Sequence, residues 1–351
     1  MTQTRSILLT AAAVAVLLAG CTAPRGPSLT ATETGAAIDR LWQDSSTVGS
    51  SAAWSQLPGD ALAAVSAATL PAGTPAGTLP RGVYTYDQIA ETWVSTGASD
   101  DLDLNWVHDA VAYRLLVDWD ETAPTTMVQG ATGPETEVPT GAGSTLTRGG
   151  VEVGSLALTS AWAVDQCGHD EPTAASLSGM VGDAAASIAL DRLGFTLSDT
   201  DATDTVTAEA GATALAGGDS LSAYLELTLA GELEHDAGCV IVGFTPETGS
   251  VAAGVSVTVA GEQRSADLET AFGGLVYEAG SLSGIDLDGT VRFDGVLAVS
   301  FAGVLDDANS NGVPGDQLVL TFADDQTMTL EEFLLDQVGW APLAALRLMT
   351  R

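Results

Sequence analysis

The fold is decided by the alternation in Leu221-Ser222-Ala223-Tyr224-Leu225-Glu226-Leu227-Thr228-Leu229. Every odd position of this stretch is apolar, and most even positions are polar. Side chains of a β-strand point alternately to its two faces, so the stretch predicts a strand with one apolar face and one polar face. An amphipathic helix would instead place its apolar residues three and four positions apart.

The same period of two recurs on both sides of this stretch, in residues 111–119, 255–259 and 285–293. Short turn signals separate the runs, and the links are too short for the helical crossovers that parallel strands need. We therefore expect a mainly β fold with one or more large antiparallel sheets, built as a curved half-barrel or a sandwich, with a few short helices. The turn signals are Thr147-Arg148-Gly149-Gly150, Ala216-Gly217-Gly218-Asp219 and Asp294-Gly295.

Asp294-Gly295 is the strongest hairpin signal, because these two residue types accept the positive φ angles of a primed two-residue turn. The turn would pair Phe293 with Val296, which is consistent with one apolar face. It would also pair Arg292 with Leu297, and this pair of a charged and an apolar residue is not consistent with one apolar and one polar face. Either the second strand is apolar on both faces, or a bulge shifts the register.

Helices are expected at four places in the chain. A capping box in Thr329-Leu330-Glu331-Glu332 precedes Phe333-Leu334-Leu335, and Gly339 could stop that helix. Leu177, Val181, Ala184 and Ile188 recur at helical spacing, and Gly194 could close this second helix. The other two candidates are residues 38–42 and 60–68.

The N-terminus carries one early positive charge at Arg5, an apolar run from Ile7 to Leu18, and the residues Leu18-Ala19-Gly20-Cys21. This order predicts a secretory signal peptide. The last four residues resemble the lipobox of prokaryotic lipoprotein precursors. The resemblance implies that Cys21 receives a diacylglycerol and becomes the first mature residue. An uncut membrane anchor is the alternative, but the apolar run is about a dozen residues, against the roughly 20 that a spanning helix needs.

The expected organisation follows from this N-terminus. Residues 1–20 form the signal peptide, residues 21–81 a lipidated tether and loosely structured N-terminal segment, and residues 82–351 an antiparallel β-rich body. Sub-lobes of the body could divide near residues 165–200. The lipid would place the protein in the cell envelope, outside the cytoplasm, and Thr22 after the Cys favours the outer surface or outer membrane.

The chain is strongly acidic, with 46 acidic residues against 11 basic ones and a net charge of −35. Such a charge repels phosphate backbones, so nucleic acids are excluded as partners. All the basic residues are Arg. The absence of Lys excludes Schiff-base chemistry and the P-loop phosphate site. Codon bias or life at high salt explains the composition without any specific acidic ligand surface.

Cys167 and Cys239 form an even pair once Cys21 carries lipid. In an exported protein such a pair predicts a disulfide. His169 and His235 lie close to the two cysteines in the sequence, so a Cys₂His₂ zinc site is the alternative.

The run from Asp307 to Asp316 places oxygen-bearing side chains at alternate positions before a glycine, as the opening of a calcium loop does. It resembles the Asp/Asn-rich loops of EF-hands and of extracellular acidic repeats. An EF-hand needs a Glu at the twelfth position, where this chain has Leu318. The candidate calcium ligands are Asp307, Asn309, Asn311 and Asp316. A long hairpin loop without metal is the alternative.

Gly218-Asp219-Ser220-Leu221 resembles the nucleophile block of GDSL-type esterases. The resemblance implies Ser220 as nucleophile, with a late Asp-x-x-His supplying the base. No such motif follows here, and His235 lies only 15 positions downstream.

The sequence therefore favours a non-catalytic binding or structural component of the cell envelope, attached to the membrane by its lipid. A concave apolar β face open to solvent would make it a carrier of hydrophobic ligands; an envelope protein is the other possible partner. The alternatives are a calcium-ordered adhesion or scaffold module and an anchored esterase that uses Ser220.

Overall fold

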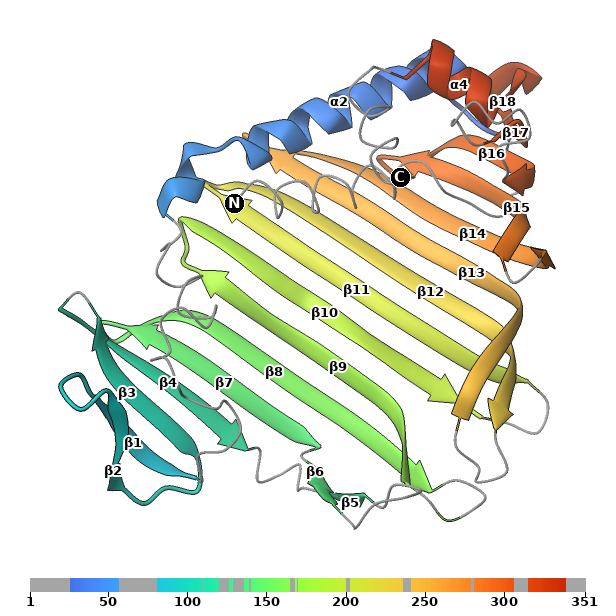
Figure 1. Cartoon of the computed structure of the whole chain (residues 1–351). Helices are drawn as coiled ribbons and strands as arrows, with labels where there is room; N and C mark the ends of the chain where they lie inside the picture. Colours follow the sequence, from blue (N-terminus) through green and yellow to red (C-terminus); the bar gives the residue numbers. More distant parts are fainter. Residues whose placement is uncertain are drawn as a thin grey trace.

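The structure is a computed structural model, and it describes residues 26–56, 81–108, 110–119, 126–128, 136–138, 140–164, 168, 170–199, 203–235, 241–278, 281–305 and 315–338. These described residues confirm the mainly β fold. They form one large mixed sheet of 16 strands that does not close on itself (Figure 1). The strands run across the molecule in almost unbroken chain order, because nearly every strand pairs with the next one in the sequence.

The strand order in the sheet is β18-β17-β16-β15-β14-β13-β12-β11-β10-β9-β8-β7-β4-β3-β1-β2. All neighbours are antiparallel except β1 and β3, which are parallel. Two further strands, β5 (Thr126–Val128) and β6 (Thr136–Val138), form a separate ribbon. The strands of the sheet are β1 (Gly82–Asp87), β2 (Thr92–Gly97), β3 (Leu102–His108), β4 (Val111–Trp119), β7 (Gly141–Arg148), β8 (Val151–Val164), β9 (Asp170–Gly182), β10 (Ala186–Ser198), β11 (Asp204–Ala216), β12 (Asp219–His235), β13 (Ile241–Val259), β14 (Glu262–Glu278), β15 (Ser281–Phe293), β16 (Val296–Leu305), β17 (Gln317–Thr321) and β18 (Thr327–Thr329).

The expected hairpin turns are present. Gly149-Gly150, Gly217-Gly218 and Asp294-Gly295 each have two consecutive positive φ angles, for example 49° at Asp294 and 76° at Gly295. This is the backbone of a type I′ turn, whose twist matches that of the strands it joins. Ala260-Gly261 makes the same turn between β13 and β14.

A β-bulge in β16 shifts the pairing of β15 and β16 beyond the Asp294-Gly295 turn. Phe293 pairs with Val296 and Arg292 with Leu297, but Val291 then pairs with Val299. Ala298 is the extra residue on β16, and it is fully buried. After the bulge, the apolar residues of β16 share a face with those of β15 again.

The helix predicted over residues 177–188 is wrong. This segment forms the end of β9, a tight turn and the start of β10. Apolar residues four positions apart, such as Leu177 and Val181, share a face of a strand as well as a face of a helix, because four is an even number. In the turn, Asp183 Oδ1 accepts hydrogen bonds from the backbone N–H groups of Ala185 (2.8 Å) and Ala186 (3.1 Å).

The helix predicted near residues 38–42 is longer than expected, because α2 spans Ala31–Gly49. Thr30 caps it, and Glu33 completes the capping box. Ile38 and Leu41 are buried on the sheet. The helix crosses β11 to β14 at one end of the strands (Figure 1). The compact body thus includes α2, which lies within the segment assigned above to the tether and loosely structured N-terminal part.

The C-terminal helix is confirmed as α4 (Leu330–Asp336), with Thr329 and Glu332 forming the predicted capping box. Gly339 and the helix expected at 60–68 lie outside the described residues. Two short 3₁₀ helices complete the elements of the described residues, η1 (Ala52–Gln56) and η2 (Ala323–Asp325). Among the described helices, none combines the length and the apolar character needed to cross a membrane.

Two separate hydrophobic cores stabilise the sheet. The larger, which we call the helix core, joins α2 and α4 to β11–β17 and includes Leu41, Val257 and Phe333. The smaller, which we call the aromatic core, lies on β1, β3, β4, β7 and β8. Within it, the rings of Trp106 and Tyr113 stack at 5.5 Å between centroids. The sheet is hydrogen-bonded continuously from β8 to β11, between the two cores.

Candidate functional site

The two cores lie on the same face of the sheet, which we call the α2 face. Directly paired residues of antiparallel strands share a face, so this face can be followed from strand to strand by the register. One such row crosses the sheet between the cores and is apolar at every position. It consists of Leu158, Leu177, Leu193, Ala210, Leu225 and Ala253.

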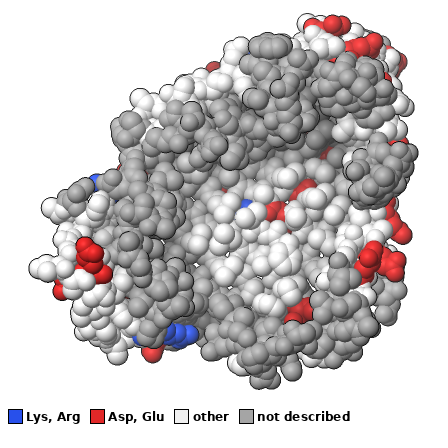
Figure 2. Space-filling view, in the orientation of Figure 1, with Lys and Arg blue, Asp and Glu red and all other residues white. Residues whose placement is uncertain are grey.

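The part of the α2 face between the cores is open. Leu193 and Leu225 are 49% and 46% exposed, although both belong to this apolar face. Figure 2, drawn from the side seen in Figure 1, shows that the middle of the sheet is mostly uncharged, with larger acidic patches toward the rim. We call this open region the apolar band. Its exposed large side chains are Leu156, Leu158, Leu193, Phe195 and Leu225.

We infer a trough along β11 in the apolar band from the sizes of the side chains that the register places on this face. The residues of β11 on this face are small: Ala208, Ala210 and Ala212. Large side chains flank Ala208 and Ala210 on both sides, with Phe195 and Leu193 on β10 and Leu227 and Leu225 on β12. Ala212 lies between Leu190 on β10 and Ala223 on β12. Strands β10 and β12 are about 10 Å apart, since each spacing is about 4.8 Å. Alanine therefore forms the floor of a channel with leucine and phenylalanine walls.

The trough has the dimensions of an extended hydrocarbon chain. From Val206 to Ala212 it spans seven residues, and the first and last are about 20 Å apart. Beyond this stretch Ala214 and Ala216 are buried in the helix core, which closes that end. An apolar ligand lying along β11 would cover walls that are now exposed to water.

The opposite face, which we call the polar face, is built of hydroxyl and carboxyl side chains. Its threonines and serines bond across strands, as in Thr159 with Ser176 (2.7 Å) and Thr213 with Ser222 (3.1 Å). Such pairs satisfy polar groups without a ligand. The sheet is thus amphipathic, with apolar side chains on the α2 face and polar side chains on the opposite face.

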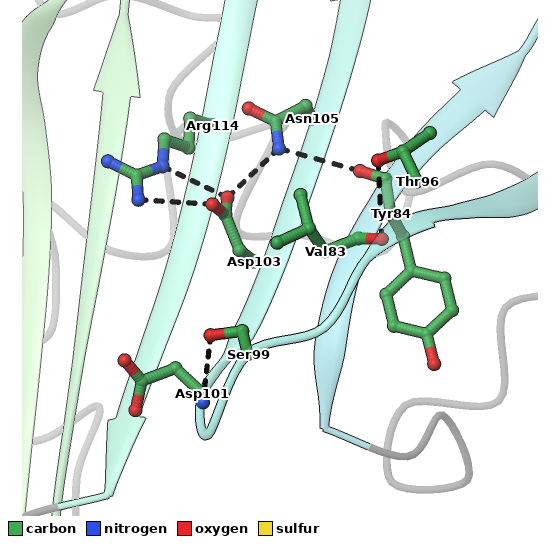
Figure 3. A network of polar contacts seen from close by, with 8 residues as sticks. All are labelled: Val83, Tyr84, Thr96, Ser99, Asp101, Asp103, Asn105 and Arg114. Atoms are coloured by element: carbon green, nitrogen blue, oxygen red, sulfur yellow. Dashed lines mark hydrogen bonds and ion pairs between the residues drawn. The ribbon is translucent and has the colours of Figure 1, made fainter.

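A separate polar network lies at the end of the sheet that carries β1, β3 and β4 (Figure 3). Arg114 Nε donates to Asp103 Oδ1 at 2.9 Å, and Arg114 Nη2 donates to Asp103 Oδ2 at 3.1 Å. Asn105 Nδ2 donates to Asp103 Oδ1 at 2.9 Å. The hydrogen bond to Asp103 raises the pKa of Arg114. Because the Asp103 carboxylate is already engaged by both neighbours, this network joins strands rather than forming a reactive site.

The residues of the esterase hypothesis are not brought together. Ser220 and His235 lie near opposite ends of the single strand β12. A strand rises about 3.4 Å per residue, so 15 residues place them about 50 Å apart, far beyond hydrogen-bond reach. Ser220 pairs with Leu215 and Thr258 inside the sheet. The motif at Gly218 therefore opens a strand after a glycine turn.

Most of the other predicted site residues lie outside the described residues. They are Cys21, Cys167, His169, Cys239, Asp307, Asn309 and Asn311. Asp316 is described and directly precedes β17. The disulfide, the zinc alternative and the calcium loop consequently remain predictions. Within the described ranges, no group of three or more His, Cys, Asp or Glu side chains is placed to hold a metal ion.

The trough was not identified from the sequence, although one signal for it is visible. Alanine occupies every even position from Ala208 to Ala216, which gives one strand a face of small side chains. The walls come from separate strands, so the channel exists only once β10, β11 and β12 are aligned.

Comparison of the chain with protein-family models, curated proteins and solved structures gave no match. The function proposed below therefore rests on the sequence and the geometry of this chain.

Proposed function

We propose that this protein is a lipid-anchored, extracytoplasmic component of the cell envelope that binds the hydrocarbon chain of a lipid-like ligand without catalysing a reaction. The open apolar band between the two cores carries the binding proposal. The signal peptide and the lipobox at Cys21 support the location, since a lipid anchor would hold the body beside a source of such ligands.

Burial of the apolar band provides the driving force. A large apolar side chain contributes about 1.5–3 kcal/mol when it is fully buried. Covering the exposed half of five such side chains would yield about 4–7 kcal/mol, before the cost of ordering the ligand. This is enough for measurable binding, especially where a membrane keeps the ligand concentrated.

The absence of catalysis is supported by the separation of Ser220 from His235, which are held at opposite ends of β12. At the trough floor the hydrocarbon chain of the ligand would contact only methyl groups, which belong to Ala208, Ala210 and Ala212. Side chains of this kind bind a hydrocarbon and offer no group that reacts with it.

Equilibrium binding of a fluorescent fatty acid to residues 22–351 tests the proposal. The double variant Leu193→Ser/Leu225→Ser removes one wall side chain from each side of the trough. We expect saturable binding to the unchanged chain and an affinity roughly tenfold lower in the variant, since about 1.4 kcal/mol corresponds to a factor of ten.

The matched control is Leu335→Ser, because Leu335 is 51% exposed on α4, outside the apolar band. This variant should bind the probe as the unchanged chain does. Binding that fails to saturate, or that falls equally in the control, would contradict the proposal.

A further inference from the structure

A groove of about 390 Å³ lies on the polar face, on the side of the sheet opposite the trough. It spans β10 to β14, and its lining also includes Ala210 and Leu225, whose side chains belong to the α2 face. Its lining is distinctive because it combines an aromatic ring with several carboxylates and one guanidinium. The chemically distinctive lining residues are Asp191, Arg192, Glu209, Tyr224, Glu226 and Asp267.

A bulge in β10 aims two consecutive side chains into this groove. The register shifts between Leu190 and Arg192, so Asp191 is the extra residue. Side chains of neighbouring residues normally point to opposite faces, whereas a bulge re-aims them. Thr213 Oγ1 donates to Asp191 Oδ2 at 2.6 Å, and Arg192 Nε lies 2.8 Å from Glu209 Oε2.

Tyr224 is held flat in the middle of the groove. Its cross-strand partners are glycines, Gly211 on one side and Gly254 on the other. A Cβ atom on Gly254 would overlap the Tyr224 ring, so the ring lies directly on that glycine. Burial, followed by the negative charge of Asp267 beside the ring, raises the pKa of Tyr224. One ring face is packed, and the side chain remains 47% exposed.

The charge around this ring is unbalanced. The lining has four carboxylates and one guanidinium, Arg192, which is paired with Glu209. Outside the lining, Arg292 is the cross-strand partner of Asp267. Glu209 and Glu226 are direct cross-strand partners, an arrangement of like charges that destabilises a sheet. A positive ligand would relieve this repulsion, and an exposed aromatic face attracts cations as well.

The carboxylates are spread out rather than gathered at a point. Glu209 on β11 and Asp267 on β14 are three strand spacings apart, about 14 Å. The described residues contain no group of three acidic side chains close enough to share one metal ion. A cation that carries several charges along its length matches this layout better than a single ion does.

We propose that the groove binds a linear polyamine, with its ammonium groups at the carboxylates and its chain across the face of Tyr224. The charged and aromatic side chains of this proposal lie on the opposite face of the sheet from the side chains that wall the trough. Either proposal can therefore fail without the other.

Calorimetric titration of spermidine into the full chain, held in a nonionic detergent with 150 mM NaCl, tests the site. We expect saturable binding with one molecule per chain. Glu226→Gln and Tyr224→Leu should each weaken that binding at least about fivefold, which is about 1 kcal/mol. An uncharged diol of similar length, 1,8-octanediol, should give no binding heat. Far-UV circular dichroism of each variant checks that the sheet is intact.

Glu262→Gln is the matched control, because Glu262 starts β14 at a hairpin outside the groove and its side chain is 78% exposed. The control should bind spermidine as tightly as the unchanged chain. Heats that never saturate, or an equal loss of affinity in Glu262→Gln, would mean that spermidine only screens the acidic surface, and this would overturn the proposal. Unaltered affinity in both Glu226→Gln and Tyr224→Leu would overturn it too.

Discussion

Single glycines allow neighbouring strands to approach closely in this sheet, and Gly182 shows the effect most clearly. Its φ angle is +126°, and an added Cβ would overlap the carbonyl oxygen of Ala186 and lie 2.6 Å from Ser187 Cα. Both neighbours are backbone atoms, which cannot move aside without disturbing the β9–β10 pairing. The glycine is thus required by the hairpin itself.

Gly182→Ala should lower the free energy of unfolding by about 1–3 kcal/mol, as overpacking commonly does. Urea denaturation measures the change. Gly143→Ala is the control, because the nearest atom to its added Cβ, the carbonyl oxygen of Leu156, lies 4.0 Å away. Equal stability of the two variants would contradict this account of Gly182.

The Asp267 carboxyl group should make the free energy of unfolding fall as the pH rises, which is the opposite of the usual effect of a carboxyl group. Burial, followed by the charge of Glu269, raises its pKa above the ordinary value of 3.8, although Arg292 and the Tyr224 hydroxyl oppose the shift. A raised folded-state pKa means that the folded protein holds the proton more tightly than the unfolded chain does. Asp267 therefore costs stability above its folded pKa, and the cost disappears below 3.8.

Asp267→Asn should consequently be more stable than the unchanged chain at pH 7, and the difference should shrink as the pH falls toward 3.8. Denaturation curves of the variant and of the unchanged chain, recorded at the same pH values, measure the difference in their free energies of unfolding. The titration of all other groups largely cancels in this difference. A difference that grows toward low pH would show that the pKa of Asp267 is lowered instead.

Cys21 is the residue that we propose carries the lipid. If the lipobox functions, cells fed a radiolabelled or alkyne-bearing fatty acid will label the unchanged chain, and Cys21→Ser will lose the label. Labelling that persists in the variant would place the acyl group elsewhere and remove the main support for the anchored location.

At the scale of elements, α2 packs against one end of the open sheet, and the side chains buried between them belong to the helix core. Leu41 is 3% exposed within the helix core. Leu41→Ala should lower the free energy of unfolding by about 2–5 kcal/mol, because it leaves a cavity between helix and sheet. Leu335→Ala on the exposed side of α4 should change it far less, and thermal or chemical denaturation compares the two. Similar losses would mean that α2 is not packed as described.

Local rules in the sequence predicted several elements correctly. The glycine and Asp-Gly turns determine the hairpins, and the capping box at Thr329 determines α4, because both signals act over a few neighbouring residues. The helix expected over 177–188 failed because a spacing of four fits strand and helix alike. The bulge after Val291 could be stated only as one of two alternatives, since the choice depends on packing across β15 and β16.

At the scale of the whole molecule, the sheet separates two kinds of surface. The apolar band lies between two cores on the α2 face, and the groove around Tyr224 lies on the polar face. Neither could be located from the sequence, because each is assembled from side chains on three or more strands. The alternation in 221–229 did predict that such faces exist.

The most direct test of the central claim is photocrosslinking of residues 22–351 with a fatty acid that carries a diazirine on its chain, followed by peptide mapping. We predict saturable labelling, prevented by excess unlabelled fatty acid, at residues of β10 and β12 that wall the trough, with Leu193, Phe195 and Leu225 foremost. Labelling of the polar face around Thr213 and Ser222, or labelling that excess fatty acid does not reduce, would contradict the claim that the α2 face binds a hydrocarbon chain.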